Sequence, residues 1–316
     1  MRKIIMGRTG IKVTELCFGA LPMGPLQKNM PVEDASDVLA HGFKSGINFV
    51  DTAQIYKTYD VVRKAMDKSG ITPVISTKSA TESYEGMQAA VEQALNEMDV
   101  KKLDIFFLHA ARTTNKVFEE RAGALKCLLD YREKGVITAV GISMHSVEVT
   151  NLAAEHPEID IVFPLINFSG MGILGGSRED MEKAVTKCHD NGKGVVLMKA
   201  LAGGNLISDY KPAMDYAAAF SAGRFSQAIG MVNKAEIDMN VKYFRGEDIS
   251  AELAYTNKEN KRFGILKVVC VKCGACAAQC HSDAITIGDS CDIDESKCLK
   301  CGYCVDACPR FAVRMY

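Results

Sequence analysis

Two runs of cysteine near the C-terminus carry the clearest chemistry in the sequence. Each run has the spacing C-x2-C-x2-C-x3-C, and the runs begin at Cys270 and Cys298. With this spacing, bacterial proteins bind two 4Fe–4S clusters, each held by three thiolates of one run and the last thiolate of the other. The rule assigns the first cluster to Cys270, Cys273, Cys276 and Cys308, and the second to Cys298, Cys301, Cys304 and Cys280. Zinc and disulfides fit less well, because zinc does not use eight cysteines in two duplicated fours and disulfides need an oxidising compartment.

The rest of the composition excludes several classes of partner. The chain has 316 residues, with 38 Lys and Arg against 39 Asp and Glu, so no excess charge favours a nucleic acid or an anionic membrane. No apolar run is long enough to span a bilayer, and the N-terminus lacks the apolar core of a signal peptide. We therefore expect a cytoplasmic protein. Four scattered cysteines are predicted to be reduced structural thiols: Cys17, Cys127, Cys188 and Cys291.

A second group of reactive residues lies at the ends of apolar segments in the first third of the chain. Asp51, Tyr56, Lys78 and His109 each follow a segment with strand character. Charged side chains in such places are costly to bury unless they pair with one another. A Lys ammonium is expected to lower the pKa of a neighbouring Tyr, an Asp to hold the Lys in place, and a neutral His to orient a carbonyl. Such a group protonates an oxygen whose carbon changes oxidation state.

The alternation of strands and helices predicts how these residues are brought together. After an N-terminal hairpin, we predict eight strands separated by amphipathic helices, which indicates a (β/α)8 barrel with catalytic groups at the carboxyl ends of its strands. No G-x-G-x-x-G follows the first strand, so a doubly wound sheet is less favoured. The predicted strands are Leu16–Ala20, Asn48–Asp51, Val74–Thr77, Leu103–Leu108, Ala139–Ser143, Ile159–Ile166, Gly194–Met198 and Gln227–Met231.

The chain divides into three predicted parts. Residues 1–245 form the barrel, residues 246–262 form a polar connection, and residues 263–316 form the small cysteine-rich domain. Gly203 and Gly204 follow the seventh strand, where their backbone amides either approach a ligand or make a plain turn.

The motif residues resemble a known family. Asp51-Thr-Ala-Gln-Ile-Tyr56, Thr77-Lys78 and Leu108-His109 are similar to the catalytic tetrad of the aldo-keto reductases, and the whole chain resembles their ferredoxin-fused branch. The resemblance implies a TIM barrel followed by a bacterial-type two-cluster ferredoxin domain. It also implies that Tyr56 donates the proton, that Lys78 and Asp51 tune it, that His109 orients the carbonyl, and that a nicotinamide supplies hydride.

The residues that would contact a nicotinamide depart from the family pattern. Ser143 is kept but is followed by Met144, while Phe163 and Met198 replace the expected amide and the stacking aromatic ring. Lys234 is the one cation near the loop expected after the eighth strand, and the Arg common there is missing. Apolar side chains cannot replace amide hydrogen bonds. The remaining candidate cofactor contacts are Ser143, Asn167, Lys199, Gly203 and Asn240.

These departures favour an iron–sulfur oxidoreductase that interconverts a small carbonyl and an alcohol. Its electrons would come from the clusters, with a ferredoxin or another redox protein as partner and with NADP(H) or a flavin as less favoured cofactors. One alternative is an NADPH-dependent carbonyl reductase in which the clusters are an appended relay. Another is a non-catalytic electron-transfer or redox-sensing subunit that keeps the barrel as a scaffold.

Overall fold

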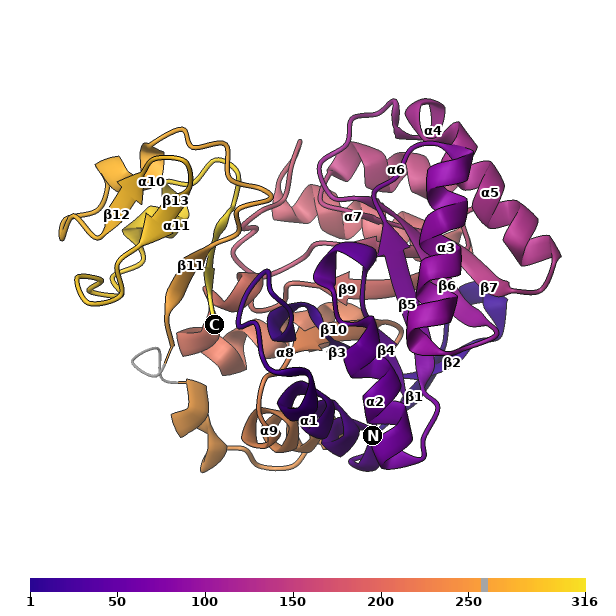
Figure 1. Ribbon diagram of the computed structural model, residues 1–316, viewed down its shortest axis with the longest axis horizontal. Helices are drawn as coiled ribbons and strands as arrows, with labels where there is room; N and C mark the ends of the chain where they lie inside the picture. Colours follow the sequence, from indigo (N-terminus) through magenta and orange to yellow (C-terminus); the bar gives the residue numbers. More distant parts are fainter. Residues whose placement is uncertain (257–260) are drawn as a thin grey trace.

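The computed structural model describes residues 1–256 and 261–316. Its larger part is a closed barrel of parallel strands in the order β10-β3-β4-β5-β6-β7-β8-β9, with helices around it (Figure 1). The predicted (β/α)8 architecture is confirmed, and every predicted strand is present within a few residues. The barrel strands are β3 (Leu16–Gly19), β4 (Phe49–Asp51), β5 (Val74–Ser79), β6 (Leu103–Ala110), β7 (Ile137–Met144), β8 (Ile161–Pro164), β9 (Gly194–Met198) and β10 (Ser226–Gly230).

The helices bury one face against the barrel. In α3, Met87, Val91 and Met98 recur at helical spacing and are fully buried, and the Ser83 hydroxyl caps the helix by accepting a hydrogen bond from the Gly86 amide. Within the described residues, none of the helices combines the length and apolar character needed to cross a bilayer. The helices of the barrel are α1 (Val32–Lys44), α2 (Tyr59–Ser69), α3 (Tyr84–Met98), α4 (Val117–Glu120), α5 (Ala122–Glu133), α6 (Val147–Glu155), α7 (Arg178–Asp190), α8 (Tyr210–Ser221) and α9 (Lys234–Arg245).

The predicted N-terminal hairpin closes one end of the barrel. Strands β1 (Lys3–Ile5) and β2 (Lys12–Thr14) pair antiparallel. Ile4, Met6 and Val13 pack into the same apolar cluster as Phe107 and Phe163, whose rings lie 5.4 Å apart inside the barrel. This end carries the amino ends of the parallel strands, so the opposite end is free to hold a site.

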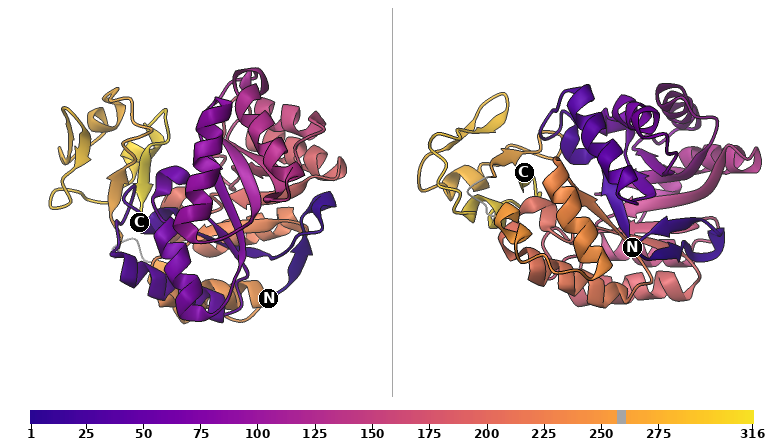
Figure 2. Two further views of the ribbon diagram at one scale, coloured as in Figure 1. Left: turned by 45° about the vertical axis from the view of Figure 1, so that its right-hand side comes forward. Right: turned by 90° about the horizontal axis from the view of Figure 1, so that it is seen from below.

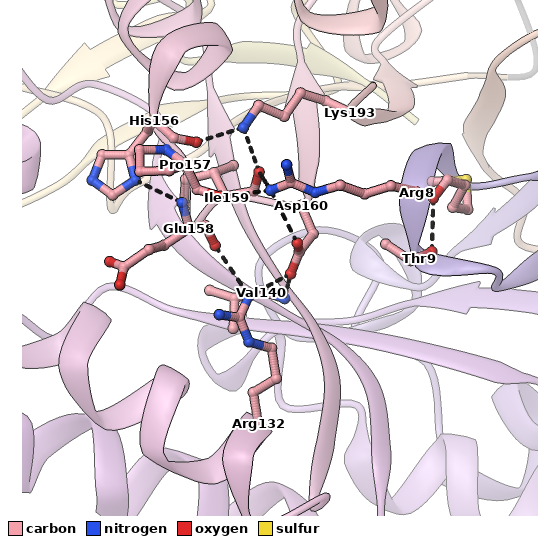
Figure 3. Close-up of polar contacts among 11 residues, drawn as sticks. Arg8, Thr9, Arg132, Val140, His156, Pro157, Glu158, Ile159, Asp160 and Lys193 are labelled. Carbon is pink, nitrogen blue, oxygen red and sulfur yellow. Dashed lines mark hydrogen bonds and ion pairs between the residues drawn. The ribbon is translucent and has the colours of Figure 1, made fainter. Parts of the chain in front are cut away.

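Charged side chains tie this closed end together (Figure 3). Asp160 accepts hydrogen bonds from Arg132 Nη1 at 2.8 Å and from the Val140 amide at 3.1 Å, and Arg8 Nη2 lies 3.4 Å from its other oxygen. Lys193 Nζ donates to the carbonyl oxygen of Ile159 at 2.6 Å. These contacts connect the hairpin, α5 and the entry to β8, which indicates a stabilising role far from the strand ends that carry reactive residues.

The C-terminal domain packs beside the barrel, as the yellow segment of Figures 1 and 2 shows. Its first and last strands pair antiparallel, with Phe263 opposite Met315, so both ends of the domain return to the barrel. Ahead of it, Ile249 is buried in the barrel core, which means that the start of the predicted polar connection docks on the barrel. The elements here are β11 (Phe263–Ile265), α10 (Ala275–Ala278), β12 (Ile285–Ile287), β13 (Cys291–Ile293), α11 (Tyr303–Asp306) and β14 (Val313–Met315).

Two predicted positions differ in detail. Lys78 and His109 were expected just after their strands but lie within β5 and β6, which continue further than apolar character alone indicates. Asn240, a predicted cofactor contact, lies inside α9. Strands β5 and β6 include Lys78 and His109 because a polar side chain that faces a site does not prevent its backbone from hydrogen-bonding to the neighbouring strand.

Candidate active site

A buried ion pair forms the centre of the open end of the barrel. Asp51 ends β4 and Lys78 lies near the end of β5, the neighbouring strand. Lys78 Nζ donates to both Asp51 oxygens, at 2.7 and 2.6 Å, and to the carbonyl oxygen of Thr52 at 2.8 Å. The two residues are 4% and 2% exposed. Burial raises the pKa of Asp51 and lowers that of Lys78, and the attraction between the two side chains opposes both shifts.

Tyr56 and His109 lie beside this pair. Tyr56 is in the short helix η3 (Gln54–Tyr56) that follows β4, and Lys78 Nζ lies 4.9 Å from the centre of its ring. The rings of Tyr56 and His109 meet edge to face, with their centres 6.1 Å apart. The four residues of the predicted tetrad therefore line one pocket.

The prediction that Lys78 lowers the pKa of Tyr56 is wrong. Burial raises the pKa of Tyr56 well above its usual value of 10, and the Asp51 carboxylate raises it further. The three protons of the Lys78 ammonium all have acceptors, two on Asp51 and one on Thr52, so none is left for the Tyr56 hydroxyl. Tyr56 is consequently held as a neutral phenol, which can donate a proton to an oxygen that gains negative charge.

His109 is held neutral, as the sequence predicts. Burial lowers its pKa to about 3, and the charges of Lys78, Arg121 and Lys199 add to this effect. Arg121 Nη1 also donates to the backbone oxygen of His109 at 2.9 Å, which fixes the end of β6. A neutral imidazole in this position can hydrogen-bond to a substrate oxygen without carrying charge into the pocket.

Both domains form the pocket, whose volume is about 280 Å³. The barrel contributes the four residues above together with Leu21, Ser143, Phe163, Met198 and Lys199. The C-terminal domain contributes Leu266, Val268, Val269, Arg314, Met315 and Tyr316. The cysteine-rich domain is therefore a wall of the pocket as well as an appendage of the barrel.

The glycines after β9 make room for the end of the chain. A Cβ at Gly204 would lie 1.7 Å from the backbone oxygen of Met315, and one at Gly203 would lie 2.5 Å from Cδ of Arg314. Both glycines also have positive φ angles, 66° at Gly203 and 92° at Gly204. Strand β14 thus covers the backbone that was expected either to approach a ligand or to form a plain turn.

The other predicted cofactor contacts divide into two groups. Ser143 and Lys199 line the pocket. Asn167 does not: its amide donates to the Met171 backbone oxygen at 3.0 Å and accepts from the Met171 amide at 3.0 Å, which shapes a loop. Asn240 reaches the pocket wall, but its side chain accepts from Tyr210 Oη at 2.9 Å and donates to the Glu236 backbone oxygen at 2.7 Å.

Sequence reasoning missed several pocket residues, among them Arg112, His145 and Arg314. Arg112 follows His109 by three positions and carried a usable signal, since it continues a strand end that was already singled out. His145 follows Ser143 in the same way. Arg314 gave no signal, because only the fold brings the end of the chain to the barrel.

The four cysteines of the first predicted ligand set line one small cavity. The cavity is lined by Cys270, Cys273, Cys276 and Cys308, together with Cys291. Cys291 was predicted to be a reduced structural thiol; it is buried and free, and its Sγ lies 3.9 Å from that of Cys276. Strand β13 carries Cys291 into the cavity, and the residues around it in the sequence contain no cysteine spacing that would indicate this.

The second set gathers around Cys304. Burial raises the pKa of Cys304 to about 12, and the neighbouring thiols of Cys298, Cys301, Cys276 and Cys280 raise it as well. The thiols of Cys280 and Cys308 have equivalent environments in the two halves of the domain. Each accepts a hydrogen bond from the amide four residues later, at 3.3 and 3.2 Å respectively. The donor set and its duplication fit two iron–sulfur clusters.

Comparison with known proteins agrees with both halves of this description. Residues 15–253 match the profile of the aldo/keto reductase family. The chain belongs to this family. Residues 269–312 match the 4Fe-4S dicluster domain, so this aldo/keto reductase carries a dicluster domain at its C-terminal end.

Several named proteins resemble this aldo/keto reductase. A probable aldo-keto reductase of Glycine max is 27% identical over 221 residues, which are 65% of this chain and 60% of that protein. L-Galactose dehydrogenase of Arabidopsis thaliana is 22% identical over 221 residues, 66% of this chain and 67% of that protein. The aligned segment thus leaves a third or more of each relative unmatched.

Solved structures share the barrel. The holo form of an aldo-keto reductase from Bacillus halodurans superposes with a TM-score of 0.66 at 18% identity and covers 82% of this chain and 96% of its own. A Bombyx mori aldo-keto reductase in complex with NADP gives a TM-score of 0.60 at 14% identity and covers 81% and 92%. At these identities the likeness shows the fold.

Proposed function

We propose that this aldo/keto reductase interconverts a small carbonyl compound and the corresponding alcohol, with electrons carried by two 4Fe–4S clusters. One observation carries the proposal. The wall of the pocket that holds Asp51, Tyr56, Lys78 and His109 is completed by the domain that contains the cysteine runs. The proposal keeps the predicted division into a barrel of residues 1–245, a connection of residues 246–262 and a cluster domain of residues 263–316.

The side chains of the barrel supply the acid–base half of this reaction. Reduction adds two electrons and two protons to the carbonyl. Tyr56 donates the proton that ends on oxygen, and the proton that ends on carbon comes from water. His109, neutral and lining the same pocket, donates a hydrogen bond to the carbonyl oxygen and orients it. Lys78 Nζ lies 4.9 Å from the centre of the Tyr56 ring, and its bonds to Asp51 and to the Thr52 carbonyl oxygen hold the ion pair beside the phenol.

The cysteines supply the redox half. Cys270, Cys273, Cys276 and Cys308 would hold one cluster, and Cys298, Cys301, Cys304 and Cys280 the other. When bound, such clusters supply electrons one at a time. The external reductant that balances the reaction is therefore a one-electron donor, of which a reduced ferredoxin is the natural class.

Three features of the pocket argue against a nicotinamide in the usual place. Phe163 and Met198 line the wall where an amide and an aromatic ring were expected. Strand β14 lies over Gly203 and Gly204. A second candidate function, NADPH-dependent carbonyl reduction, is favoured by family membership and by Ser143 and Lys199, which still line the pocket.

The two candidates differ in where the electrons come from. We would titrate the fully clustered protein anaerobically with NADPH, NADH and reduced ferredoxin in separate experiments while following cluster absorbance and any bound flavin. Bleaching by reduced ferredoxin but not by either nicotinamide is the expected result. Bleaching by NADPH would contradict the proposal and support the second candidate.

The acid–base role is tested separately with two matched tyrosine variants. Tyr56→Phe should slow carbonyl reduction by about 10²–10⁴-fold, the usual contribution of a general acid, and leave cluster reduction unchanged. The control is Tyr59→Phe, which removes a buried hydroxyl that bonds to Thr77 Oγ1 at 2.8 Å, outside the pocket lining. Equal effects of the two substitutions would contradict the role of Tyr56 as the proton donor. Cluster reduction without carbonyl turnover in the native protein would favour a non-catalytic electron-transfer or redox-sensing subunit.

A further inference from the structure

Three cationic side chains from distant parts of the chain line the pocket together. Arg112 follows β6, Lys199 follows β9, and Arg314 lies in β14. All three line the pocket, and we call them the cationic cluster. Lys199 has a φ of 63°, a left-handed conformation that is unfavourable for a residue with a side chain. Such strain persists where the surrounding structure requires it, often in a functional site.

No carboxylate offsets this charge in the described part of the chain. None of the ion pairs formed by residues 1–256 and 261–316 includes Arg112, Lys199 or Arg314. The two acidic residues that line the pocket have other partners. Asp51 pairs with Lys78, and Glu236 accepts from Lys261 Nζ at 2.5 Å.

Two buried polar nitrogens that belong to residues lining the pocket also lack partners. Nε of Arg314, a residue that is 2% exposed, has no hydrogen-bond partner, and neither has Nδ1 of His145, which is 6% exposed. Buried polar atoms are nearly always satisfied, so unpaired ones indicate a missing ligand group. The charges of Lys199, Arg112 and Arg314 act after burial to lower the pKa of His145, which places all four residues close together.

Part of the cluster also has a structural role. Arg314 stacks on the ring of Phe311 at 3.9 Å, and Nη1 donates to the Val313 backbone oxygen at 3.1 Å. Arg112 donates to the backbone oxygen of Arg310. Burial lowers the pKa of both guanidinium groups, and Cys308 opposes this shift. The pKa of Lys199 is lowered well below its usual value by burial and then by the charges of Arg314, Arg112 and Lys78.

We infer that the cationic cluster binds a carboxylate of the molecule that reacts at Tyr56. The substrate is then a small oxo acid or the corresponding hydroxy acid. The inference rests on the proposed carbonyl chemistry and adds a substrate class to it. A carboxylate bound by Lys199 and the two guanidinium groups would place the carbonyl toward Tyr56 and His109, which line the same cavity. The cavity of about 280 Å³ suits a metabolite of a few carbon atoms. A phosphate group could bind the same three cations, and the experiment below distinguishes a phosphate from a carboxylate.

The test compares charged and neutral forms of the same carbonyl compounds. Isothermal titration of the fully clustered protein would use pyruvate, acetoacetate and levulinate, which place the carbonyl at three distances from the carboxylate, against their methyl esters. At least one acid should bind about tenfold or more tightly than its ester, since charge-assisted hydrogen bonds contribute that much. Inorganic phosphate, added as a competitor, distinguishes a phosphate-binding site from a carboxylate-binding one.

Lys199→Met is the decisive variant, because Lys199 does not contact the cluster domain's thiols. It should remove the preference for the acid and leave the cluster midpoint potentials unchanged. Arg112→Met should weaken binding of the acid in the same way and provides a second test within the cationic cluster. Lys3→Met, which changes an exposed lysine on the hairpin at the closed end, is the matched control and should alter neither property.

The results separate this inference from the proposed function. Equal binding of acids and esters in the native protein overturns the inference, and reduction of the neutral esters would still support the carbonyl chemistry. Tight NADPH binding that depends on Lys199, without any preference for oxo acids, overturns it as well. Acid binding that depends on Lys199, together with turnover unaffected by Tyr56→Phe, would uphold the subsite and reject the proposed role of Tyr56.

Discussion

Replacing Asp51 by Asn should destabilise the barrel strongly, because it leaves Lys78 charged and unpaired. Lys78 is 2% exposed and would lose both bonds to carboxylate oxygens, keeping a single strong acceptor on Thr52. Removing one partner of a buried ion pair typically costs about 3–5 kcal/mol in the free energy of unfolding. Adding Lys78→Met should recover most of this loss, since an apolar replacement of the whole pair is often nearly neutral.

The loss should depend on pH in a definite direction. In the native protein, attraction to Asp51 opposes the burial that lowers the pKa of Lys78. Without Asp51, the pKa of Lys78 in the folded protein falls further below its value in the unfolded chain, about 10.4. Between these two values the unfolded chain binds more protons, so the stability of Asp51→Asn should rise with pH.

Urea unfolding followed by far-ultraviolet circular dichroism at neutral and alkaline pH measures both effects. Asp37→Asn is a suitable control, because Asp37 pairs with Lys68 on the surface, where ion pairs contribute little. The reasoning would be refuted if Asp51→Asn were no more damaging than this control, or if its stability did not change with pH.

Three further predictions concern the pocket and the clusters. Because the pKa of Tyr56 is raised well above 10, carbonyl reduction should not decline on the alkaline side until above about pH 10, and a steady-state pH profile with an earlier decline would contradict this. Cys273→Ser should halve the iron content of the purified protein, whereas Cys291→Ala should leave it unchanged, because the eight-cysteine set is complete without Cys291; iron and sulfide analysis decides both. Gly204→Ala should detach β14 and expose the C-terminus to carboxypeptidase, since the new Cβ would lie 1.7 Å from a backbone oxygen. Gly135→Ala is the control: its φ of 72° is similarly unfavourable but no atom lies within 4 Å, so it should cost about 1 kcal/mol and leave β14 in place.

The sequence by itself determined the features that depend on local spacing. The cysteine runs indicate a dicluster domain because ligand spacing within a few residues is set by the size of a cluster. Asp51, Lys78 and His109 were recognisable from the sequence because each lies at the end of an apolar segment. The carboxyl ends of parallel strands in a barrel meet at one end, so these residues were expected to lie close together. The strand pattern predicted the barrel for a similar reason, since apolar periodicity is a property of neighbouring residues.

Only the tertiary structure decided the properties that depend on contacts between distant residues. The pKa of Tyr56 depends on where the three protons of the Lys78 ammonium go, and no spacing in the sequence reveals that two of them bond to Asp51 and one to Thr52. The cationic cluster requires Arg314, which lies 202 positions after Arg112 in the sequence and reaches the barrel because β14 pairs with β11 and packs over Gly204. Charge and hydrogen bonding act through space, so the chain must be folded before they identify a site.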